Sequence, residues 1–475
     1  MLVVSLPITS QPMVAKFART GSVAPVAGIF LGFIFIFWFV PYIFKRGEIP
    51  RQTIPILVFT LWAVIVTLAA FFRENPPYKD IRLISSVLKG LVTLFIGVTF
   101  YLVTSSYIRN ISILKLTLRM VNWGGLVIIL WSFCQVAVNL ILGNYPPWMD
   151  AIQSFFSTGV LVLGRATGLA LEPSWLAHQL NMLYLPYWLA AATCRFSAHS
   201  FKLWKFHFED VLLVFGASTL MISFSRVGML AFLLMAAFIF IRLNIKIIKK
   251  VEVRIFRKSS SPSKSVFILF QLGFVISLVI LYSVVIYAIA LTFIRFDPRM
   301  AGLFQFVQGE SDPVLHYANS LKFGERLVYW LAAWKIFSDF PWLGVGLGIA
   351  GYYFPTSIVA YGWSLVEVKK LFFHSANLLN IKSLWFRLLA ETGIIGFSIF
   401  ISWLFVILIS SIKMVLEKDK FIKVIGLTGI LILIGFCIEG FSIDSFAMPY
   451  LWFSTGIVTA GSMIYDTERF NANIR

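Results

Sequence analysis

Arg326 is the residue whose chemistry stands out first in this 475-residue chain. It opens a run that continues to Trp330, inside residues 295–383, the one long stretch that is not a series of apolar segments. A guanidinium group keeps its charge and offers planar pairs of N–H donors that match phosphate oxygens. The sequence therefore predicts that Arg326, which lies within this segment, binds a phosphate group of a ligand.

Two further arginines lie beside apolar runs. Arg165 belongs to the segment Gly164–Ser174 and stands seven residues before Glu172. This pair predicts a shared polar site, or else a snorkelling pair at the membrane surface. Arg226 lies between two short apolar runs. A charge near membrane depth indicates function by default, whereas a charge at the tip of a helix hairpin does not.

Two side chains are candidate catalytic bases. His374 follows two phenylalanines near the end of the long stretch and could take up a proton at neutral pH without much tuning. A surface or capping role is its structural alternative. Glu172 is the competing candidate base. We see no carboxylate cluster on the same face that would hold a metal ion, and we expect neither a metal nor a cofactor.

Composition assigns the chain to the polytopic membrane proteins. Hydrophobic residues make up 59% and charged residues only 13%, whereas soluble domains are about a quarter charged. A span needs about 20 apolar residues. We therefore expect an all-α membrane protein with about eleven spans (ten to twelve), near residues 22–44, 52–72, 83–104, 121–142, 175–194, 208–224, 227–242, 265–294, 384–411, 422–441 and 445–465. Residues 208–242 could instead be a single broken span.

The distribution of charge predicts the topology. The net charge is +19, but the basic residues gather in short loops, which favours cytoplasmic loops over nucleic-acid binding. Eight basic residues lie between Arg242 and Lys264 alone. Alternation of the spans then leaves four segments outside: 73–82, 143–174, the tip at 225–226 and 295–383. All three arginines fall on this outer face.

Three regions follow from this pattern. Residues 1–294 are expected to form an N-terminal bundle of about eight spans, 295–383 a large extracytoplasmic loop, and 384–475 about three further spans with a short cytoplasmic tail. Inside the loop, residues 325–339 have helical spacing, with an apolar stripe through Leu327, Trp330 or Leu331, Trp334 and Phe337. Gly344, Gly346 and Gly348 then predict a tightly turned or flexible backbone, since no strand precedes them as a nucleotide fingerprint would require.

These segments together resemble the bacterial O-antigen ligase and O-antigen polymerase superfamily, multi-span glycosyltransferases that use lipid-linked sugars. The resemblance runs from about Gly164 to Gly396. Its parts, in order, are Gly168 to Ser174, Ser223 to Arg226, Arg326 to Trp330 with Pro341 and Gly344 to Gly346, and Leu389 to Gly393.

The resemblance implies that Arg165, Arg226 and Arg326 bind the diphosphate of an undecaprenyl-linked donor. Family ligases place a His-Asn pair a few residues before the last re-entering helix. Here His374 lies seventeen residues before Glu391. This departure favours a polymerase of O-antigen or exopolysaccharide repeat units over a ligase, which would transfer finished glycan to a lipid or protein acceptor.

The expected site of action is the outer face of a bacterial cytoplasmic membrane. The expected partners are the undecaprenyl-diphosphate-linked glycan donor, a glycan acceptor, the lipid bilayer and other polysaccharide-assembly proteins, and no nucleic acid. A transporter or a non-catalytic envelope-assembly subunit remains an alternative of a different class. A transporter would place charged or broken helices at the midplane, and Lys89 is the one clear mid-span charge that we identify.

Overall fold

A computed structural model describes residues 1–17, 23, 25–256, 323–375 and 377–474, together with short pieces between residues 272 and 294. The predicted loop residues 295–322, much of the predicted span 265–294, and the basic residues Arg257, Lys258 and Lys264 lie outside the described residues. The structural statements below concern the described parts of the chain.

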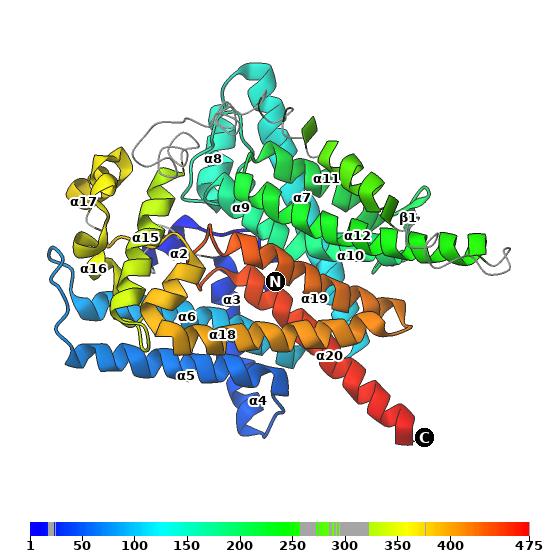
Figure 1. Ribbon diagram of the computed structural model, residues 1–475, viewed down its shortest axis with the longest axis horizontal. Coiled ribbons are helices and arrows are strands. Elements are labelled where there is room, and N and C mark those ends of the chain that lie inside the picture. Colours follow the sequence, from blue (N-terminus) through cyan, green and yellow to red (C-terminus); the bar gives the residue numbers. More distant parts are fainter. Residues whose placement is uncertain are drawn as a thin grey trace.

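The described chain is mostly helical, as expected for an all-α membrane protein (Figure 1). Its first half contains α1 (Leu2–Ser5), α2 (Pro12–Phe17), α3 (Val26–Ile34), η1 (Phe35–Phe39), α4 (Val40–Phe44), η2 (Arg51–Thr53), α5 (Ile54–Ala69), η3 (Ala70–Phe72), α6 (Leu83–Tyr107), α7 (Ile111–Leu142) and α8 (Pro147–Phe156). Next come α9 (Pro173–Gln179), η4 (Leu180–Tyr184), α10 (Leu185–Cys194), the hairpin β1 (Lys202–Leu203) and β2 (Phe206–His207), α11 (Phe208–Ile222) and α12 (Arg226–Phe256). The last helices are α15 (Gly324–Asp339), α16 (Ala350–Ser357), η6 (Ala360–Ser364), α17 (Val366–His374), α18 (Leu384–Leu416), α19 (Lys420–Glu439) and α20 (Pro449–Ile474).

Polar residues fix several helix ends. The Asn110 side chain accepts a hydrogen bond from the Ile113 N–H (2.8 Å) where α7 begins, and Asp419 does the same for Ile422 (2.9 Å) where α19 begins. Such side chains satisfy amide groups that the first helical turn leaves without partners. Gly143 ends α7 in the left-handed conformation, with φ 72°.

Seven helical segments of the described chain are long and apolar enough to cross a membrane: Val26–Phe44, Arg51–Phe72, Leu83–Tyr107, Ile111–Leu142, Arg226–Ile248, Leu384–Leu416 and Lys420–Glu439. The total of eleven therefore stays a prediction. The predicted span 208–224 forms α11, whose 15 residues reach only about 22 Å along the helix axis. The predicted span 175–194 forms one helical run, in which η4 is a π-helical turn between α9 and α10.

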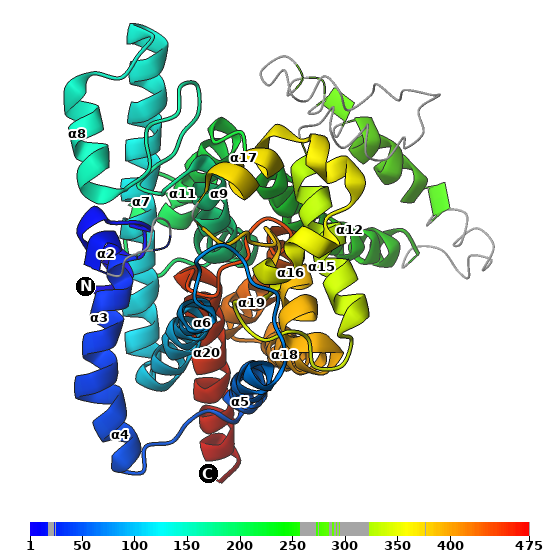
Figure 2. The ribbon, with the colours of Figure 1, turned by 90° about the vertical axis from the view of Figure 1, so that its left-hand side faces the viewer.

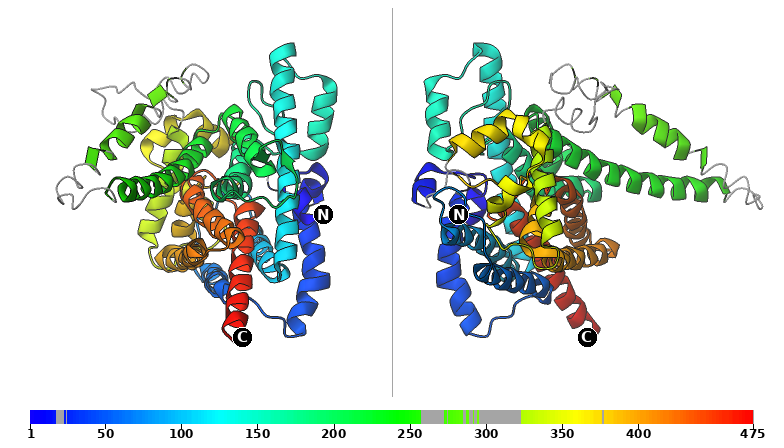
Figure 3. Two further views of the ribbon diagram at one scale, coloured as in Figure 1. Left: turned by 90° about the vertical axis from the view of Figure 1, so that its right-hand side faces the viewer. Right: turned by 60° about the vertical axis from the view of Figure 1, so that its left-hand side comes forward.

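The basic loops come together at one end of the bundle. Arg109 donates to the carbonyl of Glu48 (3.1 Å), and Arg119 donates to the carbonyl of Ala198 (2.6 Å). The Lys115 ammonium lies 5.3 Å from the ring centre of Phe421. Loops predicted to share the cytoplasmic side thus contact each other at this basic end. Figure 3 shows α12 extending away from the other helices.

Residues 323–383, here called the loop segment, lie at the other end of α5 and α18 (Figures 1 and 2). Its helices α15, α16 and α17 have a hydrophobic cluster of their own, centred on Tyr329 and Phe354. The cluster also includes Tyr78, from the region between α5 and α6, and Val87 of α6. The loop segment is therefore a packed unit, seated on the ends of the membrane helices.

A glycine-rich turn attaches the loop segment to the bundle. Val345 and Gly346 donate backbone hydrogen bonds to the carbonyls of Ala390 and Glu391, each at 2.9 Å. Gly344, Gly346 and Gly348 all have positive φ, at 70°, 96° and 77°. Only glycine adopts such backbone without strain. The alternative of a tightly turned backbone, rather than a flexible one, is correct here.

The helix predicted at residues 325–339 is confirmed, and its buried side differs from the predicted apolar stripe. The buried side of α15 consists of Val328, Tyr329, Ala332, Ala333 and Ile336, whereas Leu331 and Trp334 are exposed. The small alanines let α15 pack against α16 and α18. The tryptophan-rich stripe was the more hydrophobic pattern, but its bulk would prevent this close approach.

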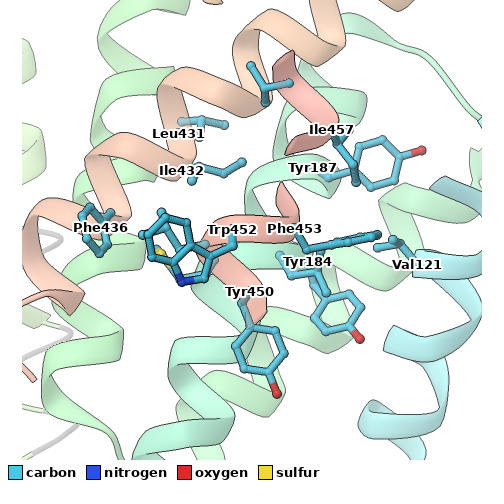
Figure 4. Close-up of a cluster of buried hydrophobic side chains, with 14 of the residues drawn as sticks. Val121, Tyr184, Tyr187, Leu431, Ile432, Phe436, Tyr450, Trp452, Phe453 and Ile457 are labelled. Atoms are coloured by element: carbon cyan, nitrogen blue, oxygen red, sulfur yellow. The ribbon is translucent and has the colours of Figure 1, made fainter. Parts of the chain in front are cut away.

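The bundle core is rich in aromatic side chains (Figure 4). Tyr450, Trp452 and Phe453 of α20 lie between residues of α19 and of η4. The indole of Trp452 stacks on Trp403 of α18, with ring centres 5.2 Å apart, and donates to the carbonyl of Phe446 (2.7 Å). This bond satisfies a buried N–H that would otherwise destabilise the core.

The glycine-rich turn yields a stability prediction. A Cβ added at Gly348 would lie 2.3 Å from the carbonyl oxygen of Ser86, at a positive φ. Gly348→Ala is therefore expected to destabilise the protein by about 1–3 kcal/mol or more. The melting temperature in detergent is the measurement. Gly32→Ala is the control, because no atom lies within 4 Å of its added Cβ; equal melting temperatures for the two variants would contradict the tight packing.

Candidate functional site

Arg165 holds the turn between α11 and α12. Its Nε donates to the carbonyl of Ser223 (3.0 Å) and its Nη2 to that of Phe224 (3.3 Å). The Ala166 N–H donates to the carbonyl of Ile222, the last residue of α11 (2.9 Å). A cation at the carboxyl end of a helix is favourable. The structure therefore brings the Arg165 segment against the turn that leads into Arg226.

Arg226 is the first residue of α12 and is half-buried. The turn before it contains Phe224 with φ 48°, a conformation that is rare for a bulky side chain. The Ser225 hydroxyl then accepts a hydrogen bond from the Gly228 N–H (3.4 Å). Arg226 thus lies at the turn of a helix hairpin, and side chains of Arg165 and Ser225 hold the backbone of this turn by hydrogen bonds.

Arg326 contacts the turn between α19 and α20. Its Nη1 donates to the carbonyl oxygen of Ser442 (3.1 Å) and to its hydroxyl (3.0 Å). Neither Nε nor Nη2 forms a hydrogen bond with any other residue that the structure describes. These two nitrogens form one edge of the guanidinium plane. One nitrogen thus fixes the side chain, and the opposite edge keeps two donors for a ligand.

Aromatic rings border this arginine. Trp330, one helical turn after Arg326, stacks on Phe386 of α18 with ring centres 5.5 Å apart and planes at 18°. It also packs against Phe441, 5.4 Å away, which directly precedes Ser442. The indole N–H of Trp330 is buried and has no hydrogen-bond partner among the described residues. The Arg326 side of the turn is therefore lined by apolar rings.

The buried ion pair of Arg387 and Glu391 also contacts the turn between α19 and α20. The Arg387 Nε donates to Glu391 Oε2 (2.8 Å), and the Arg387 Nη1 donates to the carbonyl of Asp444 (2.6 Å). Glu391 Oε1 accepts from the Gly348 N–H (3.0 Å). The Asp444 carboxylate accepts from the Lys382 N–H (3.1 Å). The pair thereby connects α18, the loop segment and the α19–α20 turn.

A second buried carboxylate, Glu439, ends α19. Its Oε1 accepts from the Asn181 Nδ2 (2.6 Å), and its Oε2 lies 3.4 Å from the His178 Nδ1. His178 also lines a small hollow under the α19–α20 turn, next to Gly440 and Ser445. This cluster connects the helical run from α9 to α10 with the turn that Arg326 holds.

The two candidate bases lie in different surroundings. Glu172 is exposed, directly precedes α9, and accepts a hydrogen bond from the Ser174 hydroxyl. It belongs to the same short segment as Arg165. His374 is the exposed last residue of α17, and no hydrogen bond or ion pair joins its side chain to another described residue. The structure therefore places both candidate bases at the surface, Glu172 directly before α9 and His374 at the end of α17.

Sequence reasoning assigned no role to several residues of this end of the bundle. Arg387 and Glu391 are opposite charges four residues apart within the predicted span 384–411. Glu439 lies within the predicted span 422–441. Charges inside an apolar span are rare and indicate function or pairing. The charges of Arg387, Glu391 and Glu439 inside predicted spans could therefore have identified these residues, but the surrounding apolar residues led to their assignment as ordinary span residues.

Comparison with known families gives one match. Residues 211–401 match the family model for O-antigen ligase. The match includes Arg226, Arg326 and His374, whereas Arg165 and Glu172 precede it. A search of curated protein sequences finds no significant match.

The Arg387–Glu391 pair yields a second stability prediction. Glu391→Ala would leave a buried guanidinium group without its carboxylate and the Gly348 N–H without its acceptor, so a loss of about 3–5 kcal/mol is expected. The double variant Arg387→Met with Glu391→Leu removes both charges and is expected to lose less. Melting temperatures in detergent test this order; a double variant less stable than Glu391→Ala would contradict it.

Proposed function

We propose that this membrane protein polymerises undecaprenyl-diphosphate-linked oligosaccharide repeat units into O-antigen or exopolysaccharide. The proposal starts from the match of residues 211–401 to the O-antigen ligase family model. The family supports glycan transfer in a membrane. The observation that carries the proposed chemistry is the open guanidinium edge of Arg326, fixed through Nη1 to Ser442. Such an edge offers two parallel N–H donors to one phosphate group.

In the proposed reaction, an acceptor hydroxyl attacks the anomeric carbon of the donor sugar. The new C–O bond forms as the bond from this carbon to the diphosphate oxygen breaks. Undecaprenyl diphosphate leaves with the electron pair, and its developing negative charge is stabilised by preorganised donors of Arg326, Arg226 and Arg165. The transfer then needs no metal ion to neutralise the leaving group.

A base takes the proton of the acceptor hydroxyl. Glu172 and His374 are both proposed for this role, and Glu172 is the stronger candidate because it follows Arg165 by seven residues in the chain, and Arg165 contacts the turn before Arg226. The spacing of His374 in the sequence, seventeen residues before Glu391, is the reason for proposing a polymerase over a ligase. The active face is proposed to be the outer leaflet of a bacterial cytoplasmic membrane, opposite the basic loops.

A ligase remains the second candidate, because the matching family model bears that description. A polymerase and a ligase differ in the acceptor that each requires. Purified protein given only lipid-linked repeat units is expected to join them into a ladder of longer lipid-linked chains, resolved by gel electrophoresis. A ligase elongates nothing under these conditions and transfers glycan only when a foreign acceptor is added. Absence of the ladder, with transfer to an added acceptor, would overturn the polymerase assignment.

Arg326→Lys tests the phosphate clamp. Lysine keeps the charge but cannot present two parallel donors. Loss of one charge-assisted hydrogen bond, about 1.5–3 kcal/mol, corresponds to a fall in activity of roughly tenfold or more. Polysaccharide chain length in a null strain complemented with the variant is the measurement.

The matched control for this prediction is Arg82→Lys. Arg82 is exposed before α6, and its side chain forms no hydrogen bond with another described residue. This variant is expected to support chains of normal length. Near-normal chains with Arg326→Lys, at equal expression, would show that Arg326 is not the clamp.

A further inference from the structure

The Asn181–Glu439 pair joins two parts of the candidate site. The Asn181 amide nitrogen donates one hydrogen bond to Glu439 Oε1 (2.6 Å) and a second to the carbonyl oxygen of Gly228 (2.8 Å). Asn181 is 0% exposed and Glu439 is 1% exposed. One amide group therefore joins the end of α19 to the first turn of α12.

Each end of this link carries an arginine. Gly228 lies two residues after Arg226, within the same helical turn. At the other end, the carbonyl of Glu439 accepts the N–H of Ser442 (2.8 Å), and Ser442 is the partner of Arg326. A short chain of hydrogen bonds thus runs from the start of α12 to the turn that Arg326 contacts.

Stability alone does not account for a carboxylate at this position. Replacing a buried charged group and its partners by well-packed apolar residues is often neutral or stabilising. The two hydrogen bonds that Asn181 donates do, however, define one geometry, because a shift of α12 or α19 would break them and leave buried polar atoms without these partners. The two hydrogen bonds of Asn181 therefore hold α12 at a fixed distance from the α19–α20 turn.

We propose that Asn181 and Glu439 are positioning residues, which fix the separation of Arg226 and Arg326 so that both guanidinium groups meet one diphosphate. This inference rests on the proposed function. Donors must be placed to within about 0.5 Å to act together on one ligand. A monophosphate can be bound by either arginine alone. The fixed separation is therefore expected to raise the affinity for a diphosphate more than the affinity for a monophosphate.

The test measures this preference directly, in detergent. The probes are undecaprenyl diphosphate and undecaprenyl monophosphate, and the readout is the ratio of their dissociation constants. The wild-type protein is expected to prefer the diphosphate. Asn181→Ala removes both bonds of the link and is expected to reduce this preference about tenfold, as for loss of one hydrogen bond to a charged group. Glu439→Gln keeps an oxygen that can accept from Asn181 and is expected to retain most of the preference.

The matched control is Asn122→Ala. Asn122 is also fully buried and donates to a buried carboxylate, Glu209 (2.9 Å), but this pair lies at the basic end of the bundle. Its loss is expected to lower the melting temperature and leave the diphosphate preference unchanged. Should Asn181→Ala fail to fold, Glu439→Ala removes the same link and is expected to reduce the preference equally.

The outcomes separate this inference from the function on which it rests. If the wild type shows no preference for the diphosphate, or if Arg326→Lys leaves the preference intact, the proposed arginine site is wrong. If Arg326→Lys loses the preference while Asn181→Ala and Glu439→Ala keep it, only the positioning role is overturned. Loss of the preference in Asn122→Ala would also overturn it, because the effect would then follow from general loosening of the bundle.

Discussion

The structure depends on keeping a few charges satisfied inside an apolar bundle. Glu391 is the clearest case, because its two carboxylate oxygens bind different parts of the chain. One accepts from Arg387 and the other from the N–H of Gly348. A carboxylate in such surroundings is strongly unfavourable unless it is paired and hydrogen-bonded. The requirement to satisfy this one group therefore fixes the loop segment against α18, and with it the place of Arg326.

The same requirement separates the bundle into two ends. α5 and α19 run from loops rich in basic residues toward the end that carries the loop segment, and α18 runs back from that end to a basic loop. At the basic end, arginine and lysine side chains contact backbone carbonyls and aromatic rings of neighbouring loops. At the other end, carboxylates and arginines form a connected set with the glycine-rich turn. Buried polar groups thus occur at both ends of the described chain, with the Asn122–Glu209 pair at the basic end and the Arg387–Glu391 pair at the other.

Much of the general plan could be predicted from the sequence. Long apolar runs define membrane helices almost without regard to tertiary context, since every backbone group must be satisfied within the helix. The helix at residues 324–339 and the turn at Gly344–Gly348 followed from local spacing. The packed face of α15 did not, because the alanines that allow close approach are less hydrophobic than the exposed Trp334. Local hydrophobicity does not reveal which side of a helix a neighbour can reach.

The candidate site was predictable in its arginines but not in what holds them. Arg165, Arg226 and Arg326 lie far apart in the sequence, and their shared role stays a prediction. The structure joins Arg165 to the turn before Arg226 through Ser223, and Arg326 to the α19–α20 turn through Ser442. The supporting residues Asn181, Glu391 and Glu439 lie within apolar helices, where a single sequence gives no indication of their partners.

Arg326 and Arg387 reach the same α19–α20 turn, and the contrast between them indicates which is suited to a ligand. Arg387 is paired with a buried carboxylate, so its charge is already balanced. Arg326 is held by the uncharged Ser442, and among the described residues no carboxylate forms an ion pair with it. A neutral acceptor orients a guanidinium group without cancelling its field. An arginine held in this way remains both oriented and attractive to an anion, which is the combination that a diphosphate site requires.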